Sequence, residues 1–230
     1  MTAFGHEETL MRKRIRVAVL CSGSASSYRF VDGKHDPGFE EAYEVVCVIS
    51  DVPDVKGIAY AKEHGVPYHV LDYRKWCKER GVKRGDLESR NVYFSEMLTV
   101  LEQYKPDVLM LSGFMLILTR VILEAFAGRI LNVHPAFLRI LNEFGKRKHR
   151  GDDAVTSTME AGDPAGSTVH IVTEEPDGGP IVAESDELPY KEGDKPSDQQ
   201  ELMKTECDGP AYLKAFKILR KHGWPERSWS

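Results

Sequence analysis

The sequence lacks the features that define several large classes of protein. Its four cysteines lie far apart and form no CxxC pair, and Cys21 and Cys47 stand in apolar runs, which indicates buried, reduced thiols. No uninterrupted apolar stretch approaches the roughly 18 residues of a membrane-spanning helix. The first residues contain no apolar core of a secretory signal, so a cytoplasmic protein without membrane contact is expected.

An excess of basic charge is also missing. The chain has 31 Lys and Arg against 36 Asp and Glu, and the resulting net charge of −5 weighs against a nucleic-acid partner. A chain of 230 residues can bury about 70% of its unfolded surface, so its stability requires neither a metal nor a disulfide. We expect a single domain over 14–222, between an N-terminal extension (1–13) and a C-terminal tail (223–230).

Short apolar runs alternate with segments of helical period, which predicts an open, mostly parallel, Rossmann-like α/β sheet with helices on both faces. The expected strands cover 14–21, 44–51, 67–72, 107–114 and 129–135, with a hairpin or strand pair over 166–188. Helices are expected from Ser26 onward and over 55–65, 86–104, 119–128 and 197–221. The apolar residues expected near one face of the 86–104 helix are Leu87, Val92, Phe94, Met97, Leu98 and Leu101.

Asn132 and His134 stand two residues apart in a predicted strand, so their side chains project from the same face. They lie at the carboxyl end of that strand, where open α/β sheets form their ligand crevices. An amide beside an imidazole can donate hydrogen bonds to an oxyanion, and the histidine can also move a proton. Taken alone, the pair is also explained by a turn-capping asparagine and a histidine buried in the interior.

Asp177 is followed by two glycines in the segment 174–180 (EEPDGGP). This is ordinary turn chemistry. The functional interpretation is a carboxylate on a tight loop that orients and ionises a histidine, with glycines that let the backbone approach a planar ligand. A third motif, 22–27 (SGSASS), follows the first strand and can form either a phosphate cradle at a helix N-terminus or a plain turn with a serine cap.

Taken together in their order along the chain, the motifs resemble those of the glycinamide ribonucleotide transformylase family. Members of this family are folate-dependent formyltransferases of purine synthesis. The similarity runs from residue 14 to 190, with a weaker trace to 215. It is carried by 111–118 (LSGFMLIL) with 128–135 (GRILNVHP), and by 166–170 (GSTVH) leading to 177–181 (DGGPI).

The resemblance implies that Asn132, His134 and Asp177 are catalytic. Asn132 and His134 would hold the formyl oxygen of 10-formyltetrahydrofolate, the co-substrate, while a substrate amine attacks. Asp177 would orient and charge His134 and help to relay the amine proton through water. No metal is implied.

The resemblance also implies the residues that bind the two small-molecule substrates. Those that match the family's folate-contacting segments are Met115, Leu116, Ile117, Leu118, Val172 and Asp177. Those that match its phosphate-binding positions are Gly23, Ser24, Ser26, Ser27 and Arg90, and Glu206 falls where the family has a glutamate near the ribose. A homodimer is a further expectation.

The sequence departs from the family around the substrate. The family usually has Gly-Asn-Gly-Ser-Asn where this chain has 23–27 (GSASS), and commonly an arginine where Leu116 stands. After Pro135 the family continues with Ser-Leu-Leu-Pro and a Pro-Gly turn, whereas this chain has 136–139 (AFLR) and a basic run at 146–150 (KRKHR). That run is interpreted as a solvated, mobile loop, with attraction of a substrate phosphate or of the folate's glutamate tail as the alternative.

Several functions are compatible with these motifs. The leading hypothesis is formyl transfer to glycinamide ribonucleotide. The acceptor could instead be another phosphorylated amine, such as a sugar nucleotide, or water, as in formyltetrahydrofolate deformylase. The deformylase and methionyl-tRNA formyltransferase are disfavoured, because their additional N-terminal and C-terminal domains have no counterpart in this sequence. A non-catalytic folate-binding protein is the alternative outside enzymes, and the intact Asn132, His134 and Asp177 weigh against it.

Overall fold

The computed structural model describes residues 14–33 and 43–222, so the predicted extension and tail lie outside the described residues. The strands are β1 (Ile15–Cys21), β2 (Tyr43–Ser50), β3 (Tyr68–Val70), β4 (Val108–Leu111), β5 (Ile130–His134), β6 (Thr168–Ile171) and β7 (Ile181–Glu184). They form one sheet in the order β3-β2-β1-β4-β5-β6-β7. Strands β1 to β5 are parallel, and β6 pairs antiparallel with both of its neighbours. The predicted mostly parallel sheet is confirmed.

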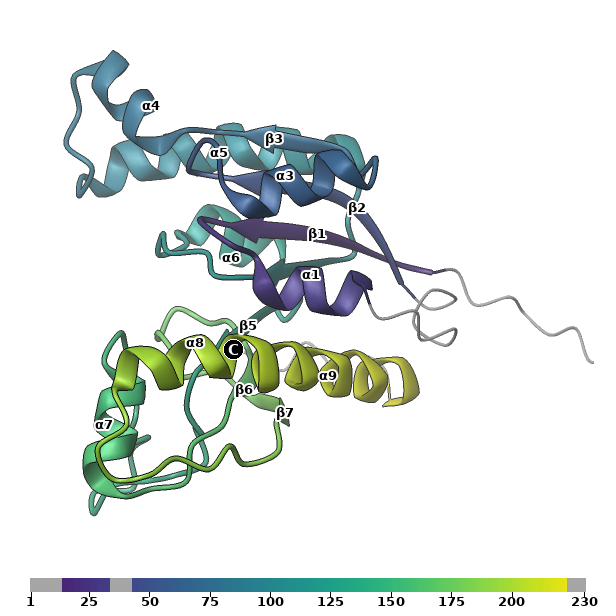
Figure 1. Cartoon of the computed structure of the whole chain (residues 1–230). Helices are drawn as coiled ribbons and strands as arrows, with labels where there is room; N and C mark the ends of the chain where they lie inside the picture. Colours follow the sequence, from purple (N-terminus) through teal and green to yellow (C-terminus); the bar gives the residue numbers. More distant parts are fainter. Residues whose placement is uncertain (1–13, 34–42, 223–230) are drawn as a thin grey trace, which may run out of the picture.

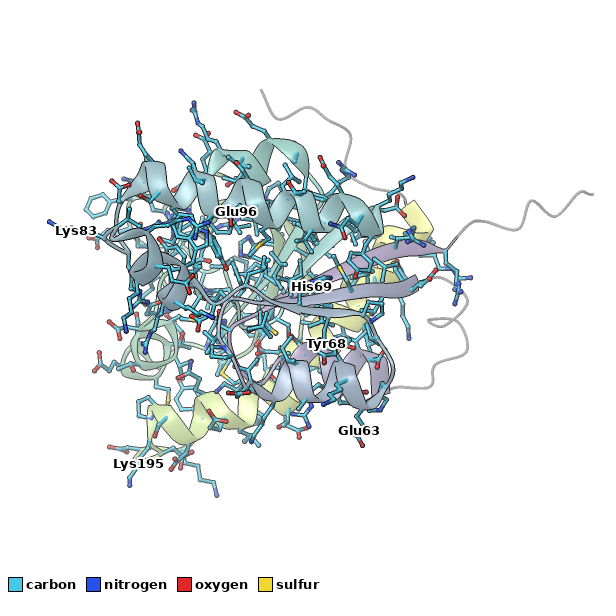
Figure 2. The ribbon with its side chains drawn as sticks, turned by 90° about the horizontal axis from the view of Figure 1, so that it is seen from above. Glu63, Tyr68, His69, Lys83, Glu96 and Lys195 are labelled. Atoms are coloured by element: carbon cyan, nitrogen blue, oxygen red, sulfur yellow. The ribbon has the colours of Figure 1, made fainter. Side chains whose placement is uncertain are left out.

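Helices cover both faces of the sheet because side chains alternate along each strand. In β1, Val17 and Val19 face a core shared with α1 (Ser26–Gly33), α3 (Lys56–Glu63) and α9 (Asp208–His222). Ala18 and Leu20 face the opposite core, shared with α4 (Tyr73–Arg80), α5 (Leu87–Tyr104) and α6 (Arg120–Ala125). Figure 1 shows α1 beside α9. In Figure 2, Glu63 and Glu96 mark the helices on opposite sides of β3.

The buried face of α5 is displaced from the expected one. Leu87 and Val92 are 62% and 51% exposed, whereas Tyr93 is buried together with Phe94 and Met97. The prediction was wrong for Leu87, which is the first residue of the helix, and for Val92, which lies about 200° around the helix from the buried Phe94. The expected buried, free Cys21 and Cys47 are confirmed.

Two unpredicted helices and one divided helix differ from the sequence-based expectation. The helices α4 and α7 (Ala154–Ala161) lie where no element is predicted. The expected helix over 197–221 is divided into α8 (Pro196–Glu206) and α9. The break falls at Cys207 because Pro210, which has no N–H, fits only in the first turn of a new helix. A Cβ on Gly209 would lie 2.3 Å from the Phe30 ring, so this glycine allows α9 to pack against α1.

The order of the strands positions the site. The chain turns from one side of the sheet to the other between β1 and β4, and parallel sheets of this kind open a ligand crevice at the carboxyl ends of the strands there. The loops after β1, β4 and β5 therefore meet at one edge. Over the described ranges 14–33 and 43–222, no helix has the length and apolar content needed to cross a membrane.

Candidate active site

The loops after β1 and β4 are joined directly. Ser22 donates its N–H to the carbonyl of Gly113 over 3.0 Å, and the Ser22 hydroxyl accepts the N–H of Met115 over 2.9 Å. The same hydroxyl donates to Asp51, at the end of β2, over 2.5 Å. The predicted phosphate loop and the predicted folate segment are thus neighbours at the point where the sheet reverses direction.

The segment 22–27 forms a turn that leads into α1. Ala25 has a φ of +48°, in the left-handed region that is costly for a residue with a Cβ. The Ser27 hydroxyl is buried and shares a 2.6 Å hydrogen bond with the hydroxyl of Ser112, so it faces the protein interior. Ser24 and Ser26 are partly exposed, and the first N–H groups of α1 have no partner within the helix.

The segment 115–118 alternates between solvent and core. Met115 and Ile117 are 70% and 66% exposed, whereas Leu118 is buried. Leu116 is partly buried, and it packs with Val172 against the core that carries α5 and α6. The two exposed apolar side chains therefore form the surface of the loop after β4.

His134 is the last residue of β5, and its imidazole is buried. Its Nε2 lies 2.8 Å from the carbonyl oxygen of His149 and its Nδ1 lies 3.5 Å from Oδ1 of Asp177. A carbonyl can only accept, so Nε2 carries a proton, and Nδ1 carries one only when the ring is cationic. Burial lowers the pKa of His134, and the opposing charge of Asp177 does not fully offset this. The carboxylate therefore favours the cation, as expected, but burial outweighs it.

Asp177 lies in the loop between β6 and β7 with a φ of +52°. Its Oδ2 accepts the N–H of Gly151 over 3.0 Å. Burial alone would raise the pKa of the Asp177 carboxyl, but the neighbouring His170 and His134 and the Gly151 N–H together lower it. Asp177 is therefore ionised at neutral pH. The loop glycines serve packing as well: a Cβ on Gly179 would lie 1.9 Å from the backbone oxygen of Ile171.

His170 is a site residue that the sequence reasoning missed. It is buried on β6 directly opposite Asn132 of β5. Its Nδ1 lies 3.0 Å from the carbonyl oxygen of Ile171, which assigns the proton to that nitrogen. Its Nε2 lies 3.3 Å from the Asn132 amide nitrogen and 3.5 Å from Oδ1 of Asp177. The signal was present, since His170 ends the GSTVH motif, but its place beside Asn132 depends on the β5–β6 register.

Asn132, His134 and Asp177 are therefore brought together, with His170 as the link. The Asp177 carboxylate faces both imidazoles, and His170 connects it to the Asn132 amide. A proton added to either ring lies against the carboxylate. The cluster thus offers an amide, an ionised carboxylate and two imidazoles at the carboxyl edge of the sheet.

Lys146 and Lys148 of the basic run at 146–150 are exposed, but Arg147 and Arg150 are partly buried and His149 is buried, so the run as a whole is not the solvated, mobile loop that was expected. Lys148 binds the carboxylate of Asp163 at 2.7 Å, and His149 is buried, with its Nε2 2.7 Å from the same oxygen. Arg150 binds Glu175 at 2.7 Å. Arg147 donates to the carbonyl of Asp177 and, over 2.7 Å, to that of Gly179. Arg147 and Arg150 are bound because the segment packs on the loop that carries Asp177.

Arg90 and Glu206 lie apart from this cluster. Arg90, in the first turn of α5, donates to the Arg84 carbonyl over 3.4 Å, and that carbonyl also accepts the hydroxyl of Tyr73. Glu206 is the exposed last residue of α8. Within 14–33 and 43–222, no hydrogen bond or ion pair joins either residue to Asn132, His134 or Asp177.

The strand order defines a Rossmann-like α/β protein. The polar cluster at the carboxyl ends of the strands marks a ligand site near the point where the strand order reverses. Comparison with known proteins is more specific, because the model of the formyl transferase family matches residues 15–206. The chain belongs to the formyl transferase family.

Two curated relatives illustrate the similarity. Phosphoribosylglycinamide formyltransferase of Escherichia coli (strain K12) is 29% identical over 194 residues, which cover 84% of this chain and 81% of that protein. The trifunctional purine biosynthetic protein adenosine-3 of Drosophila melanogaster is 31% identical over 87% of this chain but only 14% of its own length. This chain thus spans less than a fifth of the trifunctional proteins that it matches in fly, chicken, cow and human, where the shares are 14%, 19%, 17% and 17%.

The solved structures that are similar to this chain also include formyltransferases. Glycinamide ribonucleotide transformylase 1 from Symbiobacterium toebii superposes with a TM-score of 0.74 at 28% identity, over 90% of this chain and 88% of that one. A formyltetrahydrofolate deformylase from Pseudomonas syringae has a TM-score of 0.70 over 92% of this chain and 62% of its own, but at 21% identity it shows only a shared fold.

Proposed function

We propose that this protein transfers the formyl group of 10-formyltetrahydrofolate to the amine of glycinamide ribonucleotide, a step of purine biosynthesis. The observation that carries the proposal is the cluster of Asn132, His134 and Asp177 at the carboxyl edge of the sheet, at the positions where the family resemblance predicts catalytic residues. The names of the relatives that cover most of both chains support the same acceptor.

The proposed reaction needs an oxyanion donor and a proton acceptor. The amine nitrogen attacks the formyl carbon, and the carbonyl electron pair moves onto the formyl oxygen, where the Asn132 amide donates a hydrogen bond. The amine loses a proton through water to the pair of Asp177 and His134, in which Asp177 is ionised and Nδ1 of His134 takes up the proton. The bond from the formyl carbon to N10 of the folate then breaks, and N10 takes up a proton as the carbonyl re-forms.

His134 has a more constrained part in this scheme than the sequence suggests. Its Nε2 donates to the carbonyl of His149, so it can hold the formyl oxygen only if that hydrogen bond is exchanged. Its Nδ1 faces Asp177, where it can share the proton that the amine releases. We therefore assign His134 first to the transfer of the amine proton. Stabilisation of the oxyanion is its less favoured role.

The two substrates would occupy the loops on either side of this cluster. The exposed Met115 and Ile117 suit an apolar, planar folate ring, and Leu116, Leu118 and Val172 would support them from below. The start of α1, with Gly23, Ser24, Ser26 and the main chain at Ser27, suits a phosphate. Arg90 and Glu206 would complete the phosphate and ribose contacts. The cytoplasmic location, the homodimer and the single domain over 14–222 stay predictions.

The test is to incubate the protein with 10-formyltetrahydrofolate, with and without glycinamide ribonucleotide, and to follow the release of tetrahydrofolate. Release that requires the ribonucleotide and gives a formylated product supports the proposal. Release in its absence would replace it with a hydrolase. If nothing is released in either case, the acceptor is wrong, and the next substrates are amino sugars linked to nucleotides.

A further inference from the structure

The segment 147–151 contacts both His134 and Asp177 of the proposed catalytic cluster. The carbonyl of His149 accepts the Nε2–H of His134 over 2.8 Å, and the N–H of Gly151 donates to Oδ2 of Asp177 over 3.0 Å. These are main-chain contacts, so they depend on where the segment lies. Lys148 and His149 bind the segment to Asp163, which is not part of the loop at 175–179. Something else has to hold the segment against the loop at 175–179.

Two arginine side chains make that connection. Arg147 donates from one guanidinium nitrogen to the carbonyl of Asp177 and from the other, over 2.7 Å, to the carbonyl of Gly179. Arg150 binds the carboxylate of Glu175 and the carbonyl of Pro176. A planar guanidinium can reach two carbonyls in fixed directions, which a lysine ammonium does less well. Because Arg147 binds the carbonyls of both Asp177 and Gly179, it restrains the main chain of the residue that carries the carboxylate.

The loop needs such a restraint. Asp177 has a φ of +52°, in a region that non-glycine residues occupy at a cost, and two glycines follow it. Without a partner for its carbonyls, this stretch has many accessible conformations in which the carboxylate turns away from His134 and His170. The basic run that carries Arg147 lies in the segment where the sequence departs from the family pattern.

We propose that Arg147 is a positioning residue, which holds the 177–179 loop so that the Asp177 carboxylate faces His134 and His170. The expected loss of activity rests on the proposed function. The expected loosening of the 177–179 loop does not. Arg147 touches neither of the reacting atoms in this scheme and acts through Asp177 alone.

The main variant is Arg147→Ala, with Arg147→Lys to separate charge from geometry and Lys146→Ala as a control on the exposed basic neighbour. In Arg147→Ala, we expect kcat to fall by about a hundredfold, the scale of a catalytic group displaced by about 1 Å, while KM for either substrate changes less than threefold. Amide hydrogen exchange at 177–179 should become faster by at least about tenfold. Lys146→Ala should match the wild type in all three quantities.

A pH profile distinguishes positioning from a general loss of structure. The titratable and charged groups that face His134 are Asp177 from the β6–β7 loop, His170 from β6 and Arg147 from the basic segment. Asp177 raises the pKa of His134 more than Arg147 lowers it, so an Arg147→Ala variant whose Asp177 carboxylate has turned away should show the limb assigned to His134 at lower pH. A carboxylate that stays in place while only the cation is lost would move the limb to higher pH instead, against the proposal. Arg147→Lys keeps the cation but not the planar guanidinium, so it should move that limb less than Arg147→Ala does, with intermediate kcat and intermediate exchange at 177–179.

The proposal fails if Arg147→Ala exchanges like the wild type at 177–179, whatever happens to kcat, because the loop is then held without it. It also fails if the loop is loosened and kcat is unchanged. If the wild type transfers no formyl group to any amine, the proposed function falls, and the exchange measurements still decide whether Arg147 holds the loop.

Discussion

Oδ1 of Asp177 lies 3.5 Å from Nδ1 of His134, and the opposite nitrogen of that ring is committed to a main-chain carbonyl. The carboxylate therefore meets the one ring position whose proton is gained or lost. Burial lowers the pKa of His134, and Asp177 raises it in part. The pair forms an ionisable centre in a largely buried setting, next to the amide that is proposed to stabilise the oxyanion.

Replacing the carboxylate of Asp177 should weaken the proton acceptor without removing the loop. We expect Asp177→Asn to lower kcat by at least about a hundredfold, as for a histidine that loses its orienting partner. Because Asp177 raises the pKa of His134, the limb assigned to His134 should also move to lower pH. The measurement is kcat across pH 5 to 9, with Asp186→Asn, a carboxylate that is 96% exposed, as the control. Wild-type turnover in Asp177→Asn would exclude the proposed proton path.

Removing the amide of Asn132 should affect the transition state more than binding. We expect Asn132→Ala to lower kcat by at least about a hundredfold with little change in KM, as for the loss of an oxyanion donor. Asn91→Ala on α5 is the control. Steady-state kinetics with both substrates give the answer, and if Asn132→Ala and Asp177→Asn were both fully active, a non-catalytic folate-binding role would become the better interpretation.

The proposed phosphate loop can be tested at Gly23 without disturbing the fold. A Cβ added at Gly23 would meet no protein atom within 4 Å, and the same holds for Gly85. We expect Gly23→Ala and Gly85→Ala to have free energies of unfolding within about 0.5 kcal/mol of the wild type. Only Gly23→Ala should raise KM for the ribonucleotide, by about tenfold, since its methyl group occupies space next to the proposed phosphate. Equal KM values in the two variants would move the phosphate away from this loop.

Asp208, at the start of α9, should reduce stability at neutral pH. Its carboxyl accepts a 2.7 Å hydrogen bond from Ser167, and although part of the residue is exposed, burial of the carboxyl raises its pKa to about 6. A raised carboxyl pKa stabilises the fold fully below the unfolded value of 3.8, and this stabilisation is lost as the pH rises through 6. Asp208→Asn should therefore unfold like the wild type at pH 4 but be more stable at pH 8, by up to about 3 kcal/mol.

Chemical denaturation at the two pH values measures this difference. Asp186→Asn, in which the replaced carboxyl is exposed, should show no such dependence on pH. An equal difference between Asp208→Asn and the wild type at pH 4 and pH 8 would mean that ionisation of Asp208 is not its cause.

Local patterns in the sequence determined the layered fold and part of the site. The alternation in β1 sends Val17 and Ala18 to opposite cores, and a spacing of two residues places Asn132 and His134 together on β5. Both follow from backbone geometry over a few residues, so they can be read without knowing the rest of the chain. The motifs around Asp177 added the family and its expected catalytic residues.

Only the tertiary structure decided which distant segments meet. His170 faces Asn132 because β5 and β6 pair antiparallel in one register, and a shift of one residue would turn His170 to the other face. Arg147 is bound rather than solvated because its segment packs on the Asp177 loop, 30 residues further along the chain. The close packing of α9 on α1 at Gly209 and Phe30 likewise joins segments far apart in the sequence. Such pairings are chosen by the packing of the whole chain, which local periodicity does not encode.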